Sequence, residues 1–235
     1  MAINRVENYV PETDTFATSA IDSRPTGSST LTLSSDTSGW VQPKEFKQST
    51  TVYDKEFKPT ENSFQIIKFF GAGPFCRYKE HYIKEKTVGK RSFICPTSID
   101  SSTKCPICAT NAGKLPDDQN IPSEKYAFTV LNLSWPEGPK RQQWIVGGQI
   151  YKILYPLEHS PQGPLSRNYW AVNRTGPAGL QAKYTVQAVK GRDLAEDWQL
   201  DEALAEKAVS EVVPFTGQDI LMPTNEQLIE AASYL

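Results

Sequence analysis

The four cysteines of this chain all lie in one stretch, from Cys76 to Cys108, which also holds His81, one of only two histidines. Two residues separate Cys105 from Cys108, so a tight turn can place both sulfurs on one ion. Thirteen residues separate His81 from Cys95, and nine separate Cys95 from Cys105. Three thiolates and one imidazole complete a tetrahedral shell that is common for structural zinc. The spacing therefore predicts one structural Zn²⁺, held by His81, Cys95, Cys105 and Cys108.

Other interpretations of these cysteines remain open. A Cys-x-x-Cys pair also occurs in thioredoxin-like redox proteins, although such a pair usually opens a helix after a strand and needs no distant partner. Cys76 can replace His81 to give a four-cysteine site, or it can be a small buried hydrophobic residue. The second histidine, His159, lies in a loop near prolines, and we expect it to be solvated.

Charge is distributed unevenly along the chain. The net charge is −2, but residues 1–43 carry −3, residues 44–192 carry +10 and residues 193–235 carry −9. A basic middle followed by an acidic end favours a polyanion-binding core beside an acidic segment. That segment would compete for the basic surface or recruit partner proteins. The alternative is a set of solvated acidic helices that keep the protein soluble.

Several function classes fit the sequence poorly. No apolar run approaches the ~20 residues that cross a membrane, and no signal-peptide pattern opens the chain. We therefore expect neither a membrane span nor a signal peptide. Reduced, clustered cysteines are typical of the cytosol. The sequence holds no P-loop, and the His-x-Glu element of a zinc deaminase does not precede the Cys-x-x-Cys pair. We therefore expect a protein that is not an enzyme.

The hydrophobic pattern predicts three regions: a flexible N-terminal arm at 1–43, a core at 44–192 with a zinc subdomain at 76–110, and an acidic helical segment at 193–235. Apolar runs in the core predict strands at 63–70, 76–83, 91–95, 126–133, 141–146, 168–173 and 181–189, and a short helix at 149–156. In the last strand, alternation places Ala182, Tyr184, Val186 and Ala188 on one face. Amphipathic patterns predict helices at 200–213 and 224–235, the second with Thr224 as its N-cap.

These parts favour a mainly β fold with peripheral helices. An OB-type β-barrel with a zinc-binding hairpin is the preferred architecture, because that barrel pairs an open face of strands with loops that hold single strands. A zinc-stapled β-sandwich is the alternative.

Cations and aromatic residues are interleaved through the basic region. Such a mixture suits a single-stranded nucleic acid, since cations neutralise phosphates and flat rings stack on bases. The candidate stacking residues are Tyr78, Tyr82, Phe93, Tyr126, Trp144 and Tyr184, and the candidate phosphate ligands are Lys84, Lys86, Lys90, Arg91, Lys140, Arg141 and Lys183. The alternative is a solvated basic hairpin whose aromatic residues belong to the core, and Trp144 and Tyr126 fit that alternative best.

The run His81-x₁₃-Cys95-x₉-Cys105-x₂-Cys108 resembles the zinc motif of the single-stranded-DNA-binding proteins of T-even and related tailed phages. The strand at 126–133, the strand around Trp144 and the short helix that follows come in that family's order, and the resemblance covers about residues 60–192. It implies an OB-fold core with a zinc subdomain. It also implies a protein that coats single-stranded DNA during replication, recombination and repair, in the cytoplasm of an infected bacterium.

The resemblance further implies self-association through a basic N-terminal arm, and contacts with replication proteins through an acidic C-terminal tail. This chain differs from that pattern at both ends. Its first 43 residues hold only two cations, Arg5 and Arg24, and its acidic end has a helical pattern. A different hypothesis is a zinc-ribbon protein-interaction module, such as a phage transcription regulator. That hypothesis explains the zinc motif and the acidic helices, but not the aromatic residues of the basic region.

Overall fold

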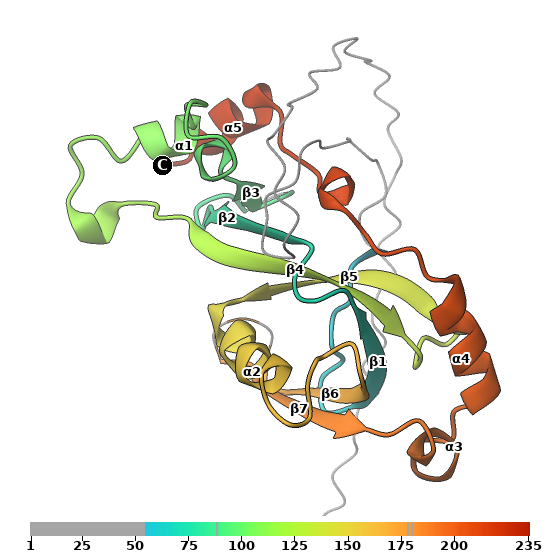
Figure 1. Cartoon of the computed structure of the whole chain (residues 1–235). Helices are drawn as coiled ribbons and strands as arrows, with labels where there is room; N and C mark the ends of the chain where they lie inside the picture. The colour runs from blue at the N-terminus through green and yellow to red at the C-terminus, as the bar shows by residue number, and fades with distance from the viewer. Residues whose placement is uncertain (1–54, 88, 178, 180) are drawn as a thin grey trace, which may run out of the picture.

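The structure is a computed structural model that describes residues 55–87, 89–177, 179 and 181–235 (Figure 1). The arm expected at 1–43 lies outside these residues. Within them, no helix has the length and apolar character that a membrane crossing requires.

One antiparallel sheet carries the described part of the chain. Its strands are β1 (Phe64–Phe70), β2 (Cys76–Tyr82), β3 (Ser92–Ile94), β4 (Ser123–Asn132), β5 (Lys140–Gly147), β6 (Tyr169–Thr175) and β7 (Lys183–Val189). The helices are α1 (Pro106–Ala109), α2 (Gly148–Glu158), α3 (Asp193–Trp198), α4 (Glu202–Glu211) and α5 (Asn225–Ala232). The predicted strands are confirmed, and so are the predicted helices that correspond to α2, α4 and α5. The short helices α1 and α3 were not predicted.

Strand β4 organises the sheet. One of its edges pairs with β5 along Lys125–Asn132. Its other edge is divided, because β2 pairs with residues 123–127 and β1 pairs with residues 129–132. Between these two strands the chain turns through Gly71 and Gly73, whose φ angles of 84° and 143° favour glycine. Strand β4 therefore connects two parts of the sheet. One part is β2 and β3, which carry the motif residues, and the other is β1, β6 and β7.

The sheet is not closed into a barrel, so the prediction of an OB-type barrel is wrong for this structure. The strand order is β3-β2-β4-β1-β6-β7, with β5 on the other edge of β4. No strand in the described part of the chain joins β5 to β7. Helix α2 contacts β4, β5 and β7, and thus occupies the gap that further strand pairing would have to close (Figure 1). The architecture is mixed α/β on a seven-stranded antiparallel sheet.

Two large hydrophobic clusters pack against the sheet. The first lies against α2 and includes Trp144 and Trp170, which are 2% and 0% exposed. The predicted shared face of β7 is confirmed in part, because Tyr184, Val186 and Ala188 all pack against this cluster. The second cluster lies against α3 and α4 and includes Leu194 and Ala205 from these helices.

The acidic C-terminal segment does not form one unit. Helices α3 and α4 pack on the sheet at the lower right of Figure 1, whereas α5 lies beside α1 at the top. Thr224 is the N-cap of α5, as predicted: its hydroxyl accepts from the Gln227 amide at 3.3 Å, and the Gln227 side chain accepts from the Thr224 amide at 3.0 Å. This capping box fixes where α5 begins.

Candidate metal centre

Four ligand-type side chains converge where β2, β3 and α1 meet. His81 lies near the end of β2 and is the register partner of Phe93 in β3, which places Cys95 beside it one residue after β3. Cys105 is the residue before α1, and Pro106 is its first residue, a position that proline favours. The turn of α1 then carries Cys108 back toward Cys105.

The ligand atoms of His81, Cys95, Cys105 and Cys108 all lie within 4.8 Å of one another. His81 Nε2 is 3.3 Å from Cys108 Sγ and 3.6 Å from Cys105 Sγ, and Cys95 Sγ is 3.6 Å from Cys108 Sγ. Zinc bonds of about 2.3 Å to sulfur and about 2.0–2.1 Å to nitrogen place tetrahedral ligand atoms about 3.5–3.8 Å apart. All four cysteines are free thiols. The cluster is therefore consistent with a single metal ion such as Zn²⁺.

The chemistry of the thiols also suits a cation. His81, Cys95 and Cys105 are at most 4% exposed. Hydrogen bonding from Cys105 lowers the pKa of the Cys95 thiol to about 3, and the same interaction raises the pKa of Cys105. Burial raises the pKa of Cys108. One thiolate thus forms at the expense of its neighbours, and a divalent cation among them would allow all three to ionise.

The outer contacts of His81 come from a loop that the sequence analysis did not single out. His81 Nδ1 lies 2.8 Å from Asn120 Oδ1. Asn120 belongs to the segment between α1 and β4, and nothing in its local sequence marks it as a neighbour of the motif. Such outer contacts orient metal-bound imidazoles in many proteins.

Cys76 and His159 lie outside this cluster. Cys76 is fully buried against Tyr78, Ile94 and Ala127, and burial raises its thiol pKa well above the usual value. The interpretation of Cys76 as a small buried hydrophobic residue is confirmed. His159 is exposed, as expected, and its Nδ1 donates to the Tyr155 carbonyl at 2.9 Å.

Most of the candidate stacking residues are in the core. Tyr78, Phe93, Tyr126 and Trp144 are at most 5% exposed, so the alternative that assigned them to the core holds in this structure. Tyr184, in β7, is partly buried and packs against the cluster that includes Ile150 and Leu154 of α2. Tyr82 differs, since it is 54% exposed and the Arg91 guanidinium lies 5.2 Å from its ring centre.

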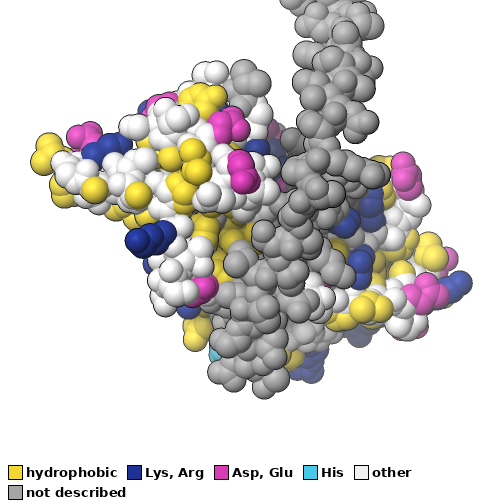
Figure 2. Space-filling view, turned by 90° about the horizontal axis from the view of Figure 1, so that it is seen from above, with side chains coloured by type: hydrophobic (Ala, Val, Ile, Leu, Met, Phe, Trp, Pro, Cys, Tyr) yellow, Lys and Arg dark blue, Asp and Glu magenta, His cyan; other side chains and the backbone are white. Residues whose placement is uncertain are grey.

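The candidate phosphate ligands divide into two groups. Lys84, Lys90 and Lys183 are exposed. The other four contact neighbouring groups, and Arg91, which is partly buried, donates from Nε to the Ile83 carbonyl at 3.3 Å. Lys86 pairs with Glu230, Lys140 lies 4.2 Å from the Trp135 ring centre, and Arg141 donates to the Val213 carbonyl at 2.6 Å. Two of these contacts are with the acidic C-terminal segment. Figure 2 views the α1–α5 side, where the described acidic, basic and hydrophobic side chains are interspersed.

A row of neighbouring aromatic rings, of which one pair is stacked and two pairs are tilted, was not predicted as a unit. It consists of Tyr126, Tyr151, Tyr155 and His159, and we call it the aromatic row. Tyr126 and Tyr151 stack with centroids 3.8 Å apart and planes 9° apart, and Tyr155 continues the row at 5.6 Å and His159 at 4.5 Å. Tyr155 is 47% exposed. The spacing of four residues from 151 to 155 to 159 places these side chains on one helical face, and could have revealed the row.

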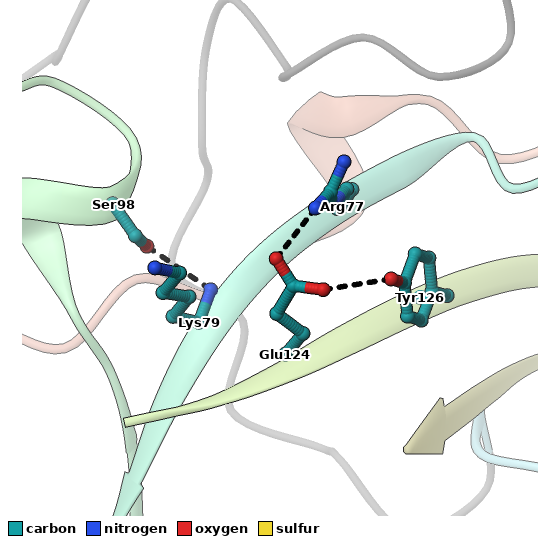
Figure 3. Close-up of polar contacts among 5 residues, drawn as sticks. All are labelled: Arg77, Lys79, Ser98, Glu124 and Tyr126. Carbon is teal, nitrogen blue, oxygen red and sulfur yellow. Dashed lines mark hydrogen bonds and ion pairs between the residues drawn. The ribbon is translucent and has the colours of Figure 1, made fainter. Parts of the chain in front are cut away.

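A cation lies at the β2 end of this row. The Arg77 guanidinium is 5.6 Å from the Tyr126 ring centre. Figure 3 shows Glu124 between them, accepting from Arg77 at 2.5 Å and from the Tyr126 hydroxyl at 2.8 Å. These two hydrogen bonds, the Arg77 bond first, lower the pKa of Glu124. Lys79, the next exposed cation on the same strand face, has its backbone amide held by Ser98 Oγ at 3.0 Å (Figure 3).

Comparisons of this chain with protein-family models, with curated proteins and with solved structures find no match.

Proposed function

We propose that this protein binds single-stranded DNA without sequence preference. The observation that carries the proposal is the aromatic row, with its exposed ring Tyr155 and with Arg77 at its other end. Flat rings bind bases of any sequence, because every base has a face that can stack, at about 1–3 kcal/mol each. The resemblance of the cysteine motif to that of phage single-stranded-DNA-binding proteins supports the same proposal.

Phosphate contacts are assigned to exposed cations around the row and the metal centre. Lys79 lies on β2 and Lys152 on α2, and both are exposed. Lys84 and Lys90 lie between β2, which contains His81, and β3, which Cys95 directly follows. Neutralising phosphates releases counterions, so the affinity should fall steeply as salt rises.

The Zn²⁺ has a structural role in this proposal. A complete shell of three cysteines and one histidine leaves no position for water. The ion would hold the connection between β2 and β3, with its cations, against α1. Roles in replication, recombination and repair in an infected bacterium, and contacts with replication proteins, belong to the proposal through the resemblance alone.

The test is a fluorescence titration of the zinc-loaded full chain with poly(dT) and with duplex of equal length, at low and high salt. We expect quenching of tyrosine and tryptophan by the single strand, preference over duplex, and loss of binding at high salt. Absence of binding to poly(dT) at low salt would rule the proposal out.

A protein-interaction module is the second candidate function. Leu115 and Ile121, in the loop before β4, are 71% and 69% exposed, and this candidate assigns them to contacts with another protein. This candidate predicts weak binding to bare oligonucleotides. The same titration therefore separates the two functions.

A further inference from the structure

Asn120 contacts three residues of the metal-motif region, by which we mean β2, β3, α1 and the loop that follows α1: His81, Tyr82 and Asn111. Its Oδ1 lies 2.8 Å from His81 Nδ1, and its Nδ2 donates to the Tyr82 carbonyl at 2.9 Å. Its backbone is held by Asn111, whose Oδ1 accepts from the Asn120 amide at 2.8 Å and whose Nδ2 donates to the Asn120 carbonyl at 3.2 Å. One side chain thus joins the loop before β4 to the buried imidazole.

These contacts determine which way the amide points. The Tyr82 carbonyl oxygen can only accept a hydrogen bond, so the group that faces it must be the NH₂ of Asn120. The oxygen of the amide then faces His81 Nδ1. An amide oxygen can only accept, so Nδ1 must carry the hydrogen.

The position of that hydrogen decides which nitrogen can bind a metal. With Nδ1 protonated in the neutral ring, the lone pair is on Nε2. Nε2 is the atom that faces the cysteines, 3.3 Å from Cys108 Sγ and 3.6 Å from Cys105 Sγ. The hydrogen bonds of Asn120 and the position of the cysteines therefore both indicate Nε2 as the metal-binding atom.

We infer that Asn120 is a positioning residue for the metal centre: it holds His81 as the Nδ1–H tautomer and so presents Nε2 to the ion. The inference concerns the metal centre alone and does not rest on DNA binding. Outer partners of this kind typically change metal affinity 10–100-fold when they are removed.

The competing explanation is that Asn120 only shapes its loop. Asn111 provides the matched control, because it holds the Asn120 backbone, whereas the ring nitrogens of His81 face Asn120, Cys105 and Cys108. Asn111→Ala weakens the loop and leaves the acceptor for Nδ1 in place. Asn120→Ala removes the acceptor, and Asn120→Asp keeps an oxygen acceptor while losing the donor to Tyr82.

Zinc affinity is measured for the full chain by competition with a chromophoric chelator. We expect Asn120→Ala to bind zinc about 10–100-fold more weakly than the unmodified chain, and Asn111→Ala and Asn120→Asp to lose clearly less. The Co²⁺-loaded proteins should show altered d–d absorption bands for Asn120→Ala only. Equal losses for Asn111→Ala and Asn120→Ala, or no loss for Asn120→Ala, would overturn the inference.

The tautomer is measured directly on the unmodified chain, so that the inference stays testable even if a variant does not fold. Long-range ¹H–¹⁵N correlation spectra resolve the ring nitrogens, and assignment is simple because the chain has only two histidines. We expect the zinc-loaded protein to show His81 protonated at Nδ1 and metal-bound through Nε2. A His81 bound through Nδ1, with hydrogen on Nε2, would refute it.

Discussion

Lys86 and Glu230 form an ion pair, with Nζ 2.5 Å from Oε1, between positions 144 residues apart in the chain. The Lys86 side chain is only 10% exposed, and its Nζ also lies 4.7 Å from the Tyr234 ring centre. The pair joins the connection between β2 and β3 to α5. Next to it, Leu228 and Ala231 of α5 are buried in one cluster with Cys95 and Cys105. The C-terminal helix therefore packs against the metal-motif region.

The packing of α5 gives the first prediction. Leu228 is 2% exposed and its neighbour Ile229 is 55% exposed. Leu228→Ala should lower the free energy of unfolding by about 2–5 kcal/mol, because it leaves a cavity in the cluster. Ile229→Ala should change it by no more than about 0.5 kcal/mol. Urea unfolding of the zinc-loaded proteins measures both, and equal effects would contradict the docking of α5.

The second prediction concerns metal content. Cys105→Ala should lose bound zinc, because three ligands remain from a four-residue cluster. Cys76→Ala should keep one zinc per chain, because Cys76 lies in a separate apolar cluster. Elemental analysis of the purified proteins gives the ratio. Zinc loss in Cys76→Ala, or its retention in Cys105→Ala, would show that the ligands are assigned wrongly.

Metal removal is the third prediction. A chelator should loosen β3, α1 and α5 before the rest of the sheet, since the ion joins short elements that have little other support. Hydrogen exchange should show early loss of amide protection in those elements. The amides of β4 that pair with β5 and the near-ultraviolet signal of Trp144 and Trp170 should change later. Simultaneous loss everywhere would mean that the ion supports the whole sheet.

The fourth prediction tests the aromatic row. Tyr155→Ala should weaken binding to poly(dT) by about 1–3 kcal/mol, because one stacking ring is lost. The salt dependence should stay the same, since no charge is removed. Phe64→Ala is the matched control, because Phe64 is similarly exposed, at 41%, and lies outside the row. Equal weakening by both variants would argue against the row as the binding surface.

The fifth prediction concerns pH. The Arg77 hydrogen bond, with that of Tyr126, lowers the pKa of Glu124 below its usual value of about 4.3. A lowered folded-state pKa means that ionised Glu124 stabilises the fold above the unfolded-state pKa. This contribution is lost as pH falls through the folded-state pKa. Arg77 and Glu124 are 47% and 38% exposed, so solvent screening limits the contribution to about 1 kcal/mol or less.

Carboxyl-carbon NMR titration measures this pKa directly. Arg77→Gln should raise the Glu124 pKa toward its usual value, while the hydrogen bond from Tyr126 remains. A Glu124 pKa that is the same in both proteins would show that the ion pair does not persist in solution.

Local features of the fold could be predicted from the sequence because their causes are local. The turn at Trp135–Pro139 separates two apolar runs, and these are β4 and β5. Thr224 with Gln227 three residues later gives a capping box, and this is where α5 begins. The spacing of the cysteines and His81 likewise predicted that the four side chains lie together, because tetrahedral coordination allows only certain sequence spacings.

The remaining features depend on contacts between distant residues. The predicted closure into a barrel does not occur, because β4 pairs with three strands and α2 packs beside β5. No single segment of the sequence shows either arrangement. Tyr78 and Phe93 are close in sequence to charged residues, yet each lies on the buried side of its strand. Phe93 is buried in one cluster with Leu228 of α5, which is distant in the sequence. Asn120 was missed since only the folded loop places it beside His81.

The cover that α5 provides has a consequence for synthesis of the protein. All four ligands exist once residue 108 has been added, but Leu228 follows 120 residues later. At about 5–20 residues per second, the ribosome supplies that cover roughly 6–24 s after the last ligand. During this interval the nascent cysteine cluster has no C-terminal helix against it, and afterwards Leu228 and Ala231 pack beside Cys95 and Cys105. The growing chain therefore offers a metal ion its widest access before synthesis is finished.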